Sequence, residues 1–185
     1  MDILTALGLS VPAGLNAYIP LLAVALAQRL HWLELRPPFD VLGSWWLITI
    51  IAVLLVVEIV ADKIPAVDHV NDIIQSVVRP AAGAVVAVAA SGSASSVSPW
   101  LLVVAGVLLA GGVHAVKATA RPVVNTATVG VGAPVVSAAE DVGAVALSAL
   151  AIVIPVLVFV VLLILGVLLW RWWRRKRTDR RRPRV

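Results

Sequence analysis

Ten charged side chains and two histidines lie between Val57 and Asp141 in an otherwise very apolar chain. Most of them lie inside, or at the ends of, segments long enough to cross a membrane. Charged groups in such segments are energetically costly, so they usually face a protein interior or a watery cavity and mark a site. The members are Glu58, Asp62, Lys63, Asp68, His69, Asp72, Arg79, His114, Lys117, Arg121, Glu140 and Asp141.

Helical spacing sorts many of these groups into an acidic set and a basic set. Glu58 and Asp62 are one helical turn apart, and His114, Lys117 and Arg121 lie at i, i+3 and i+7 on one face. On a structural interpretation, the two sets pair as buried salt bridges, because an unpaired buried charge is strongly destabilising.

A functional interpretation keeps some of these pairs but places them along a polar cavity. Protonation of Glu58, Asp62 or Asp68 is then coupled to the movement of an ion or solute. Asp68 and His69 are candidates for a gate or relay, and His69 and His114 titrate most easily near neutral pH. Both interpretations stay open at the level of the sequence.

The basic residues also suit an oxyanion, because arginine forks match phosphate and carboxylate groups. A phosphorylated lipid carrier needs such a basic pocket next to an apolar groove. However, six carboxylates outnumber four fixed cations in this region, which argues against a purely anionic site. The cations are Lys63, Arg79, Lys117 and Arg121.

A divalent-metal site formed by Asp68, His69, Asp72 and His114 is chemically possible but poorly supported. On an ideal helix, His69 is turned by about 100° from Asp68. The chain also lacks the sequence motifs of zinc proteases, serine hydrolases and phosphate-binding or dinucleotide-binding loops. We therefore expect no enzymatic activity, cofactor or bound metal.

The composition is that of an integral membrane protein. Hydrophobic residues make up 61% of the 185 residues and charged residues 14%, with a mean hydropathy of +1.02. Residues 3–28, 41–57, 80–116 and 142–170 hold no charged side chain, and a span needs only about 20 apolar residues. We expect an all-α polytopic helical bundle with four to six spans. The absence of cysteine excludes disulfides and thiolate chemistry.

The net charge of +5 belongs to the C-terminal tail. Residues 171–185 hold nine basic residues and one acidic residue, so residues 1–170 hold six basic and nine acidic residues, a net charge of −3. The tail follows Trp170 and includes Trp172 and Trp173, a pattern typical of an aromatic belt before a cytoplasmic anchor. We therefore expect a transmembrane domain over 1–170, a cytoplasmic basic tail over 171–185, contacts with membrane lipids and no nucleic-acid partner.

Several breaks are expected along the bundle. Pro12, Gly14 and Pro20 predict that the first helix, over 2–28, is either kinked or interrupted near its middle. A span follows over about 41–62. Residues 65–79 have the spacing of an amphipathic helix, and the run 80–90 either continues it or forms half of a re-entrant hairpin.

The C-terminal half is expected to contain a second break. Trp100 to Lys117 predicts a span, whereas residues 119–134 have poor helix propensity and predict irregular structure. Ser137 and Glu140 have the spacing of a capping box that opens the last helix. That helix would span about 33 residues, so it is expected to kink at Pro155 or break near Gly143.

An offset of 54 residues aligns part of the chain with itself. Trp46, Lys63, Asn71 and Pro80 fall on Trp100, Lys117, Asn125 and Pro134, and 15 of 45 aligned pairs are identical. We predict repeat units over about 44–97 and 98–151, each with broken or re-entrant helices. This layout is typical of transporters with a site at the repeat interface. The sequence leaves open whether the repeats are inverted or parallel.

Four short motifs resemble a known family. They are GLNAYIP at 14–20, ADKIPAVDH at 61–69, RPAAG at 79–83, and GGVHAVK at 111–117 with Asn125 and Thr126. Together they resemble the bacterial multi-pass membrane family catalogued as domain of unknown function 4126, over roughly residues 8–150. The resemblance implies a compact protein of the bacterial inner membrane and supplies no activity. The arginine-rich tail resembles an extension beyond the shared core.

The leading hypothesis is a small transporter or channel with a polar pathway between the two repeats. The alternatives are a noncatalytic membrane scaffold or assembly factor, and a translocase of a phosphorylated lipid carrier. A homodimer would help to shield the polar groups, and the solute or ion is left unidentified. The expected binding or pathway residues are Glu58, Asp62, Lys63, Asp68, His69, Asn71, Asp72, Arg79, His114, Lys117, Arg121, Asn125, Asn16 and Tyr18.

Overall fold

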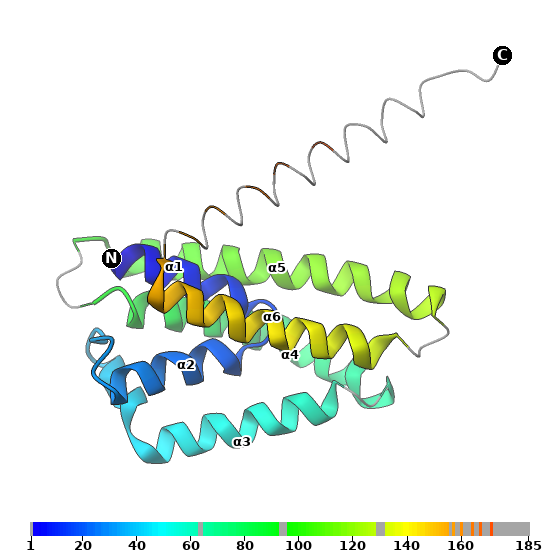
Figure 1. Cartoon of the computed structure of the whole chain (residues 1–185), viewed down its shortest axis with the longest axis horizontal. Coiled ribbons are helices and arrows are strands. Elements are labelled where there is room, and N and C mark those ends of the chain that lie inside the picture. Colours follow the sequence, from blue (N-terminus) through cyan, green and yellow to red (C-terminus); the bar gives the residue numbers. More distant parts are fainter. Residues whose placement is uncertain are drawn as a thin grey trace.

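The computed structural model describes residues 2–62, 65–92, 96–128 and 132–155, and the single residues 157, 160, 164, 167 and 171; the side chains at 2, 65–69, 125 and 133 lie outside this description. The described part is helical and forms one bundle (Figure 1). Its elements are α1 (Asp2–Ala13), α2 (Tyr18–Arg29), the short 3₁₀ helix η1 (Phe39–Gly43), α3 (Trp45–Ala61), α4 (Pro65–Ala89), α5 (Pro99–Ala127) and α6 (Ala133–Val153).

The first two helices form a hairpin that enters the bundle and turns back. Each has 12 residues, or about 18 Å, whereas the apolar core of a bilayer is about 30 Å thick. Figure 1 shows α2 returning toward the end of the bundle where α1 begins. Ala6, Leu9 and Val24 pack in one cluster between the two helices. The predicted interruption is therefore present, but the segment does not cross the bundle as a single kinked span.

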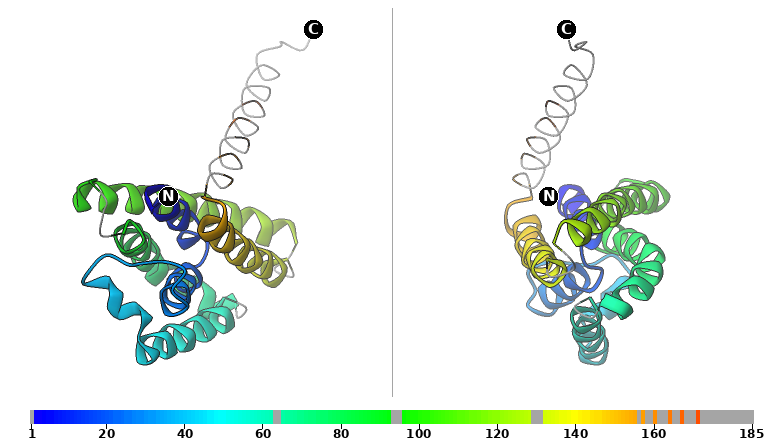
Figure 2. Two further views of the ribbon diagram at one scale, coloured as in Figure 1. Left: turned by 60° about the vertical axis from the view of Figure 1, so that its left-hand side comes forward. Right: turned by 90° about the vertical axis from the view of Figure 1, so that its right-hand side faces the viewer.

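The remaining helices supply the membrane-spanning frame. Val70–Ala89, Pro99–Val124 and Pro134–Val153 are long and apolar enough to cross a membrane. α3, with 17 residues, lies at the lower end of the length range of spans. Figure 2 shows these helices grouped around the hairpin. α1 packs against α4, α5 and α6, and α2 packs against α3 and α6. The expected all-α membrane bundle is confirmed.

Helix α4 turns its polar face inward. It continues through Pro80 to Ala89, so the run 80–90 extends the amphipathic helix and does not form a separate half-hairpin. Ile73 and Val77 are 62% and 72% exposed, whereas Gln75 and Arg79 are 2% and 0% exposed. This arrangement is the reverse of that in a soluble helix, because lipid is the solvent of the outer face.

Helix α5 crosses a segment for which irregular structure was predicted. It runs through Pro122 to Ala127, so the prediction for residues 119–127 is wrong. In an apolar environment, every backbone polar group needs an internal partner, which favours a continuous helix over an irregular one despite low propensity. The hydroxyls of Thr119 and Thr126 donate to carbonyls of the preceding turn, at 2.9–3.0 Å.

Helix α6 begins one turn before the predicted capping box. It starts at Ala133, so Ser137 and Glu140 lie inside the helix, where Ser137 Oγ donates to Asp62 Oδ2 at 3.3 Å. The predicted cap is therefore wrong, because tertiary partners take up both side chains. The helix passes through Gly143 without a break and ends before Ile154, whose φ of −139° and ψ of 71° are not helical. The residue before a proline disfavours the helical region, which explains an end beside Pro155.

The two segments of the predicted duplication differ in where their helices are continuous. The offset of 54 residues aligns the connection between α3 and α4 with residues around Lys117, which lie inside the continuous helix α5. The two segments therefore end their helices at different aligned positions. The duplication and its unit boundaries stay a prediction.

Helices α4 and α5 approach each other closely through two glycines. A Cβ added at Gly106 would collide with the carbonyl oxygen of Gly83 and with Cα of Ala84. A Cβ at Gly83 would in turn collide with Ala110 and the Gly106 backbone. Small residues let membrane helices pack backbone to backbone. This contact holds the side chains of α4 and α5 in register around the polar centre.

Candidate functional site

Asp62 is the hub of a buried polar network. It follows the last residue of α3, and its side chain is 2% exposed. Polar groups from α4, α5 and α6 converge on its carboxylate. The partners are Arg121 Nη2 at 3.2 Å, Lys117 Nζ at 3.7 Å, Arg79 Nη2 at 4.0 Å, Asn71 Nδ2 at 2.8 Å and Ser137 Oγ at 3.3 Å.

Glu140 on α6 extends the network toward one end of the bundle. Its Oε2 lies 2.8 Å from Lys117 Nζ and 3.2 Å from Arg121 Nη2. Arg121 also reaches Asp72 on α4, with its Nη1 atom 3.4 Å from both carboxylate oxygens. The basic face of α5 therefore lies between carboxylates of α3, α4 and α6, and the predicted pairing of acidic and basic sets is present.

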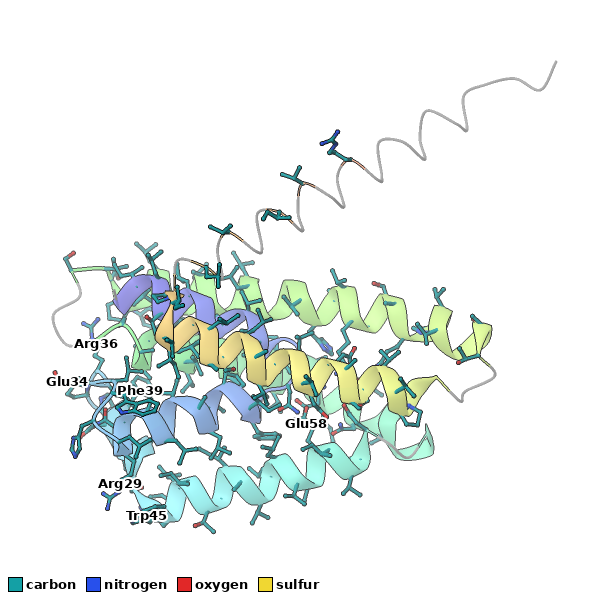
Figure 3. The ribbon with its side chains drawn as sticks, viewed as in Figure 1. Arg29, Glu34, Arg36, Phe39, Trp45 and Glu58 are labelled. Carbon is teal, nitrogen blue, oxygen red and sulfur yellow. The ribbon has the colours of Figure 1, made fainter. Side chains whose placement is uncertain are left out.

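Arg79 forms the deepest part of the network. Its side chain is 0% exposed, and Nη2 donates to Glu58 Oε1 at 3.1 Å. Nη1 lies 3.0 Å from His114 Nδ1. Because arginine carries only donors, His114 Nδ1 must accept this hydrogen bond, so the imidazole is neutral with its proton on Nε2. Figure 3 shows Glu58 pointing from α3 into the bundle.

The tip of the α1–α2 hairpin meets the same network. The carbonyl oxygen of Leu15 accepts a hydrogen bond from Lys117 Nζ at 3.0 Å. Asn16 Nδ2 donates to Asp141 Oδ1 at 3.0 Å, while Asn16 Oδ1 accepts from the backbone N–H groups of the first two residues of α2, at 3.0 and 3.2 Å. The break in the first helix thus exposes backbone groups that charged side chains satisfy.

The formal charges of the described network do not balance. Five carboxylates face three fixed cations, and His114 is neutral in its contact with Arg79. The network therefore carries an excess of two negative charges unless protons or cations bind. The carboxylates belong to Glu58, Asp62, Asp72, Glu140 and Asp141, and the cations to Arg79, Lys117 and Arg121.

A cleft of about 380 Å³ reaches the network between α5 and α6. Its walls are mainly apolar, and Lys117 and Glu140 supply its charged groups. The cleft therefore reaches this ion pair mainly at Glu140, whose side chain is 15% exposed, whereas the side chain of Lys117 is 2% exposed. The lining residues are Leu15, Gly112, Val113, Val116, Lys117, Ala120 and Glu140.

A known protein family matches nearly the whole chain. The model of a family described as domain of unknown function (DUF4126) matches residues 3–175. The chain belongs to this family. The match extends the resemblance of residues 8–150 at both ends and includes the first residues of the basic tail. No curated protein matches the chain, and no solved structure does.

This DUF4126 protein brings together most of the side chains predicted to form its site. Lys63 lies outside the described residues, as do the side chains of Asp68, His69 and Asn125. The remaining predicted residues contribute to the network or pack beside it. They are Asn16, Tyr18, Glu58, Asp62, Asn71, Asp72, Arg79, His114, Lys117 and Arg121.

The expected pathway residues of this DUF4126 site left out five contributors. Glu140 and Asp141 were counted in the charged cluster but not among the pathway residues, although they contact Lys117 and Asn16; the other three are Gln75, Ser137 and the carbonyl of Leu15. Gln75 is 2% exposed and lies beside Tyr18; its position on the polar stripe of α4, between Asp72 and Arg79, was the available signal. Ser137 was assigned to a helix cap. The carbonyl of Leu15 carries no side-chain signal, and only the break of the first helix pointed to it.

Proposed function

We propose that this protein is a small membrane transporter or channel whose polar pathway passes the tip of the α1–α2 hairpin. One observation carries the proposal. Lys117 Nζ contacts the Leu15 carbonyl, Glu140 and Asp62 at once, at 3.0, 2.8 and 3.7 Å. A charged side chain thereby meets an unwound backbone inside the helical bundle. Substrate and ion sites of transporters commonly lie at such broken helices.

Two features favour a transport pathway over a set of salt bridges that only stabilise the fold. Salt bridges that serve only to hold helices together are expected to balance in charge, whereas the described part of the network has two more carboxylates than fixed cations. A purely structural network is also expected to be closed, whereas the cleft between α5 and α6 leads to Lys117 and Glu140. The ion pairs then hold the pathway in shape and line it.

The network also extends from the centre of the bundle toward one end. Side-chain exposure rises from 1% at Glu58 and 2% at Lys117 to 15% at Glu140 and 25% at Asp72. Helix α4 begins at the end of the bundle opposite the ends of the hairpin (Figure 1), and Asp72 lies about two turns after that start. We propose that water and solute enter from this end and that the hairpin closes the other half.

Blocking the cleft provides the test. Gly112 lines the cleft, and a Cβ added there would have no neighbouring atom within 4 Å, so Gly112→Phe is expected to fill the cleft without collision. The exposed Ala115 on the same helix does not line it, which makes Ala115→Phe the matched control. In proteoliposomes tested with a panel of ions and small solutes, we expect Gly112→Phe to reduce the flux at least tenfold and Ala115→Phe to leave it near wild type. Wild-type liposomes as tight as empty ones across the panel would contradict the proposal.

A second candidate, translocation of a phosphorylated lipid, is favoured by one feature of the cleft. It combines apolar walls from Val113 and Val116 with the ammonium group of Lys117. Against it, Lys117 and Arg121 already contact Glu140 at 2.8 and 3.2 Å. Retention of lipid phosphate by the purified wild type, and its loss in Lys117→Gln, would favour this candidate over a small solute.

We further propose that the bundle resides in the bacterial inner membrane with its C-terminus in the cytoplasm. Residues 171–185, with nine basic residues, support this orientation through the positive-inside rule. The three described helices that are long and apolar enough to cross a bilayer support the membrane location.

A further inference from the structure

Glu58 has fewer polar contacts to stabilise its charge than Asp62 and Glu140 have. Asp62 receives contacts from five polar side chains, and Glu140 pairs with two cations. Glu58 has one such contact, from Arg79 Nη2 to Oε1, although its side chain is only 1% exposed. Its second oxygen, Oε2, is buried and has no hydrogen-bond partner among the described residues. A buried carboxylate without partners is costly, and protonation removes that cost.

A second buried acceptor without a described partner lies on α4. Gln75 is 2% exposed, and its Oε1 atom is also buried without a partner among the described residues. Tyr18 of α2 lies near both groups, because the side chain of Gln75 and the charge of Glu58 both act on its phenol. Two buried acceptors in the same region, one from α3 and one from α4, therefore have no hydrogen-bond donor among the described residues.

We propose that Glu58 is the proton-binding group of this protein and that the proton is held on its buried Oε2 atom, with Gln75 and Tyr18 nearby. The inference rests on the proposed transport function and identifies its coupling ion as H⁺. Water at the open end supplies the proton, an O–H bond forms on Oε2, and the same bond breaks when the proton leaves. The acid keeps Oε1 as an acceptor for Arg79, so protonation does not require the Arg79 contact to break.

Fixed charges around Glu58 make this site responsive to the rest of the network. Arg79 from α4 and Lys117 from α5 favour the ionised form, whereas Asp62 from α3 opposes it, and Tyr18 from α2 packs nearby. A solute that changes the contacts of Lys117 or Asp62 at the hairpin tip therefore changes the proton affinity of Glu58. Reciprocal coupling follows, because two ligands that affect each other's binding do so by the same free energy.

Infrared spectroscopy of the purified full-length protein in lipid tests the inference without a transport assay. At neutral pH, wild type is expected to show the C=O stretching band of a protonated carboxylic acid, shifted in D₂O and titrating as pH is raised. Glu58→Gln should lose this band. Glu34→Gln, which changes an exposed carboxylate in the loop after α2, should keep it. Gln75→Leu should keep the band but move it to higher frequency, because the acid loses an acceptor.

A wild type without the band at neutral pH, or a band that persists in Glu58→Gln, would overturn the inference. If Glu58→Gln does not fold, Glu58→Asp provides the assignment, because the shorter acid must move the band and an unmoved band counts against Glu58. Transport is measured separately. A protein with the band but without flux would contradict the proposed function and leave the proton site standing, and flux without the band would contradict the proton site alone.

Discussion

Replacement of Asp62 by alanine is expected to destabilise the protein by about 3–5 kcal/mol, the usual cost of removing one partner of a buried ion pair. Asp62 is the shared anion of Arg121, Lys117 and Arg79, at 3.2, 3.7 and 4.0 Å. Its loss leaves these cations close together with fewer carboxylates. Thermal or denaturant unfolding in detergent or lipid measures the effect.

Two further variants separate charge from packing at this position. Asp62→Asn keeps the shape and the acceptor for Asn71 but removes the charge, so most of the loss should remain. Asp40→Ala removes an exposed carboxylate from η1, where changes are usually within about 0.5 kcal/mol. Stability of Asp62→Ala equal to that of Asp40→Ala would show that the network does not hold the bundle together.

Arg79 offers the second large effect and separates the pathway from the scaffold hypothesis. Arg79→Met removes a fully buried cation that contacts Glu58 and His114 at 3.1 and 3.0 Å, and should cost about 3–5 kcal/mol. The double variant Glu58→Met with Arg79→Met removes both charges. It should recover most of the stability, because replacing a whole buried pair by apolar residues of similar size is often neutral.

Flux through the double variant then decides between the two hypotheses. A pathway that needs Glu58 and Arg79 predicts a stable protein with flux reduced to the level of empty liposomes. A scaffold in which the pair is only a tie predicts that the stable double variant retains every property of the wild type. Unfolding and flux are measured on the same reconstituted samples, so a loss of flux caused by unfolding is recognised directly.

The sequence predicted the composition of the site better than the course of the chain around it. Spacing placed Glu58 and Asp62 on one face and His114, Lys117 and Arg121 on another, and charges that must be buried seek opposite charges. Pro12 and Gly14 correctly predicted the broken first helix. No local signal showed that α2 turns back, because the return depends on packing against α4 and α6.

The errors arose where rules for soluble helices were applied inside an apolar layer. Pro122 and the neighbouring threonines predicted a loop, but α5 continues because unpaired backbone groups are costlier in lipid than poor propensity. Ser137 and Glu140 matched a capping box, yet their partners are Asp62 and Lys117 from distant segments. Tertiary pairing of this kind cannot be recognised from the spacing of two residues.

Water access to the hairpin tip tests the central claim most directly. The chain has no cysteine, so single cysteines can be introduced without background. Leu15 lies at the tip and lines the cleft, whereas Leu108 is 68% exposed on the apolar face of α5. In proteoliposomes, a charged, membrane-impermeant thiol reagent is expected to modify Leu15→Cys and to leave Leu108→Cys unmodified. Equal protection of both cysteines in folded protein would contradict a polar pathway at the hairpin tip.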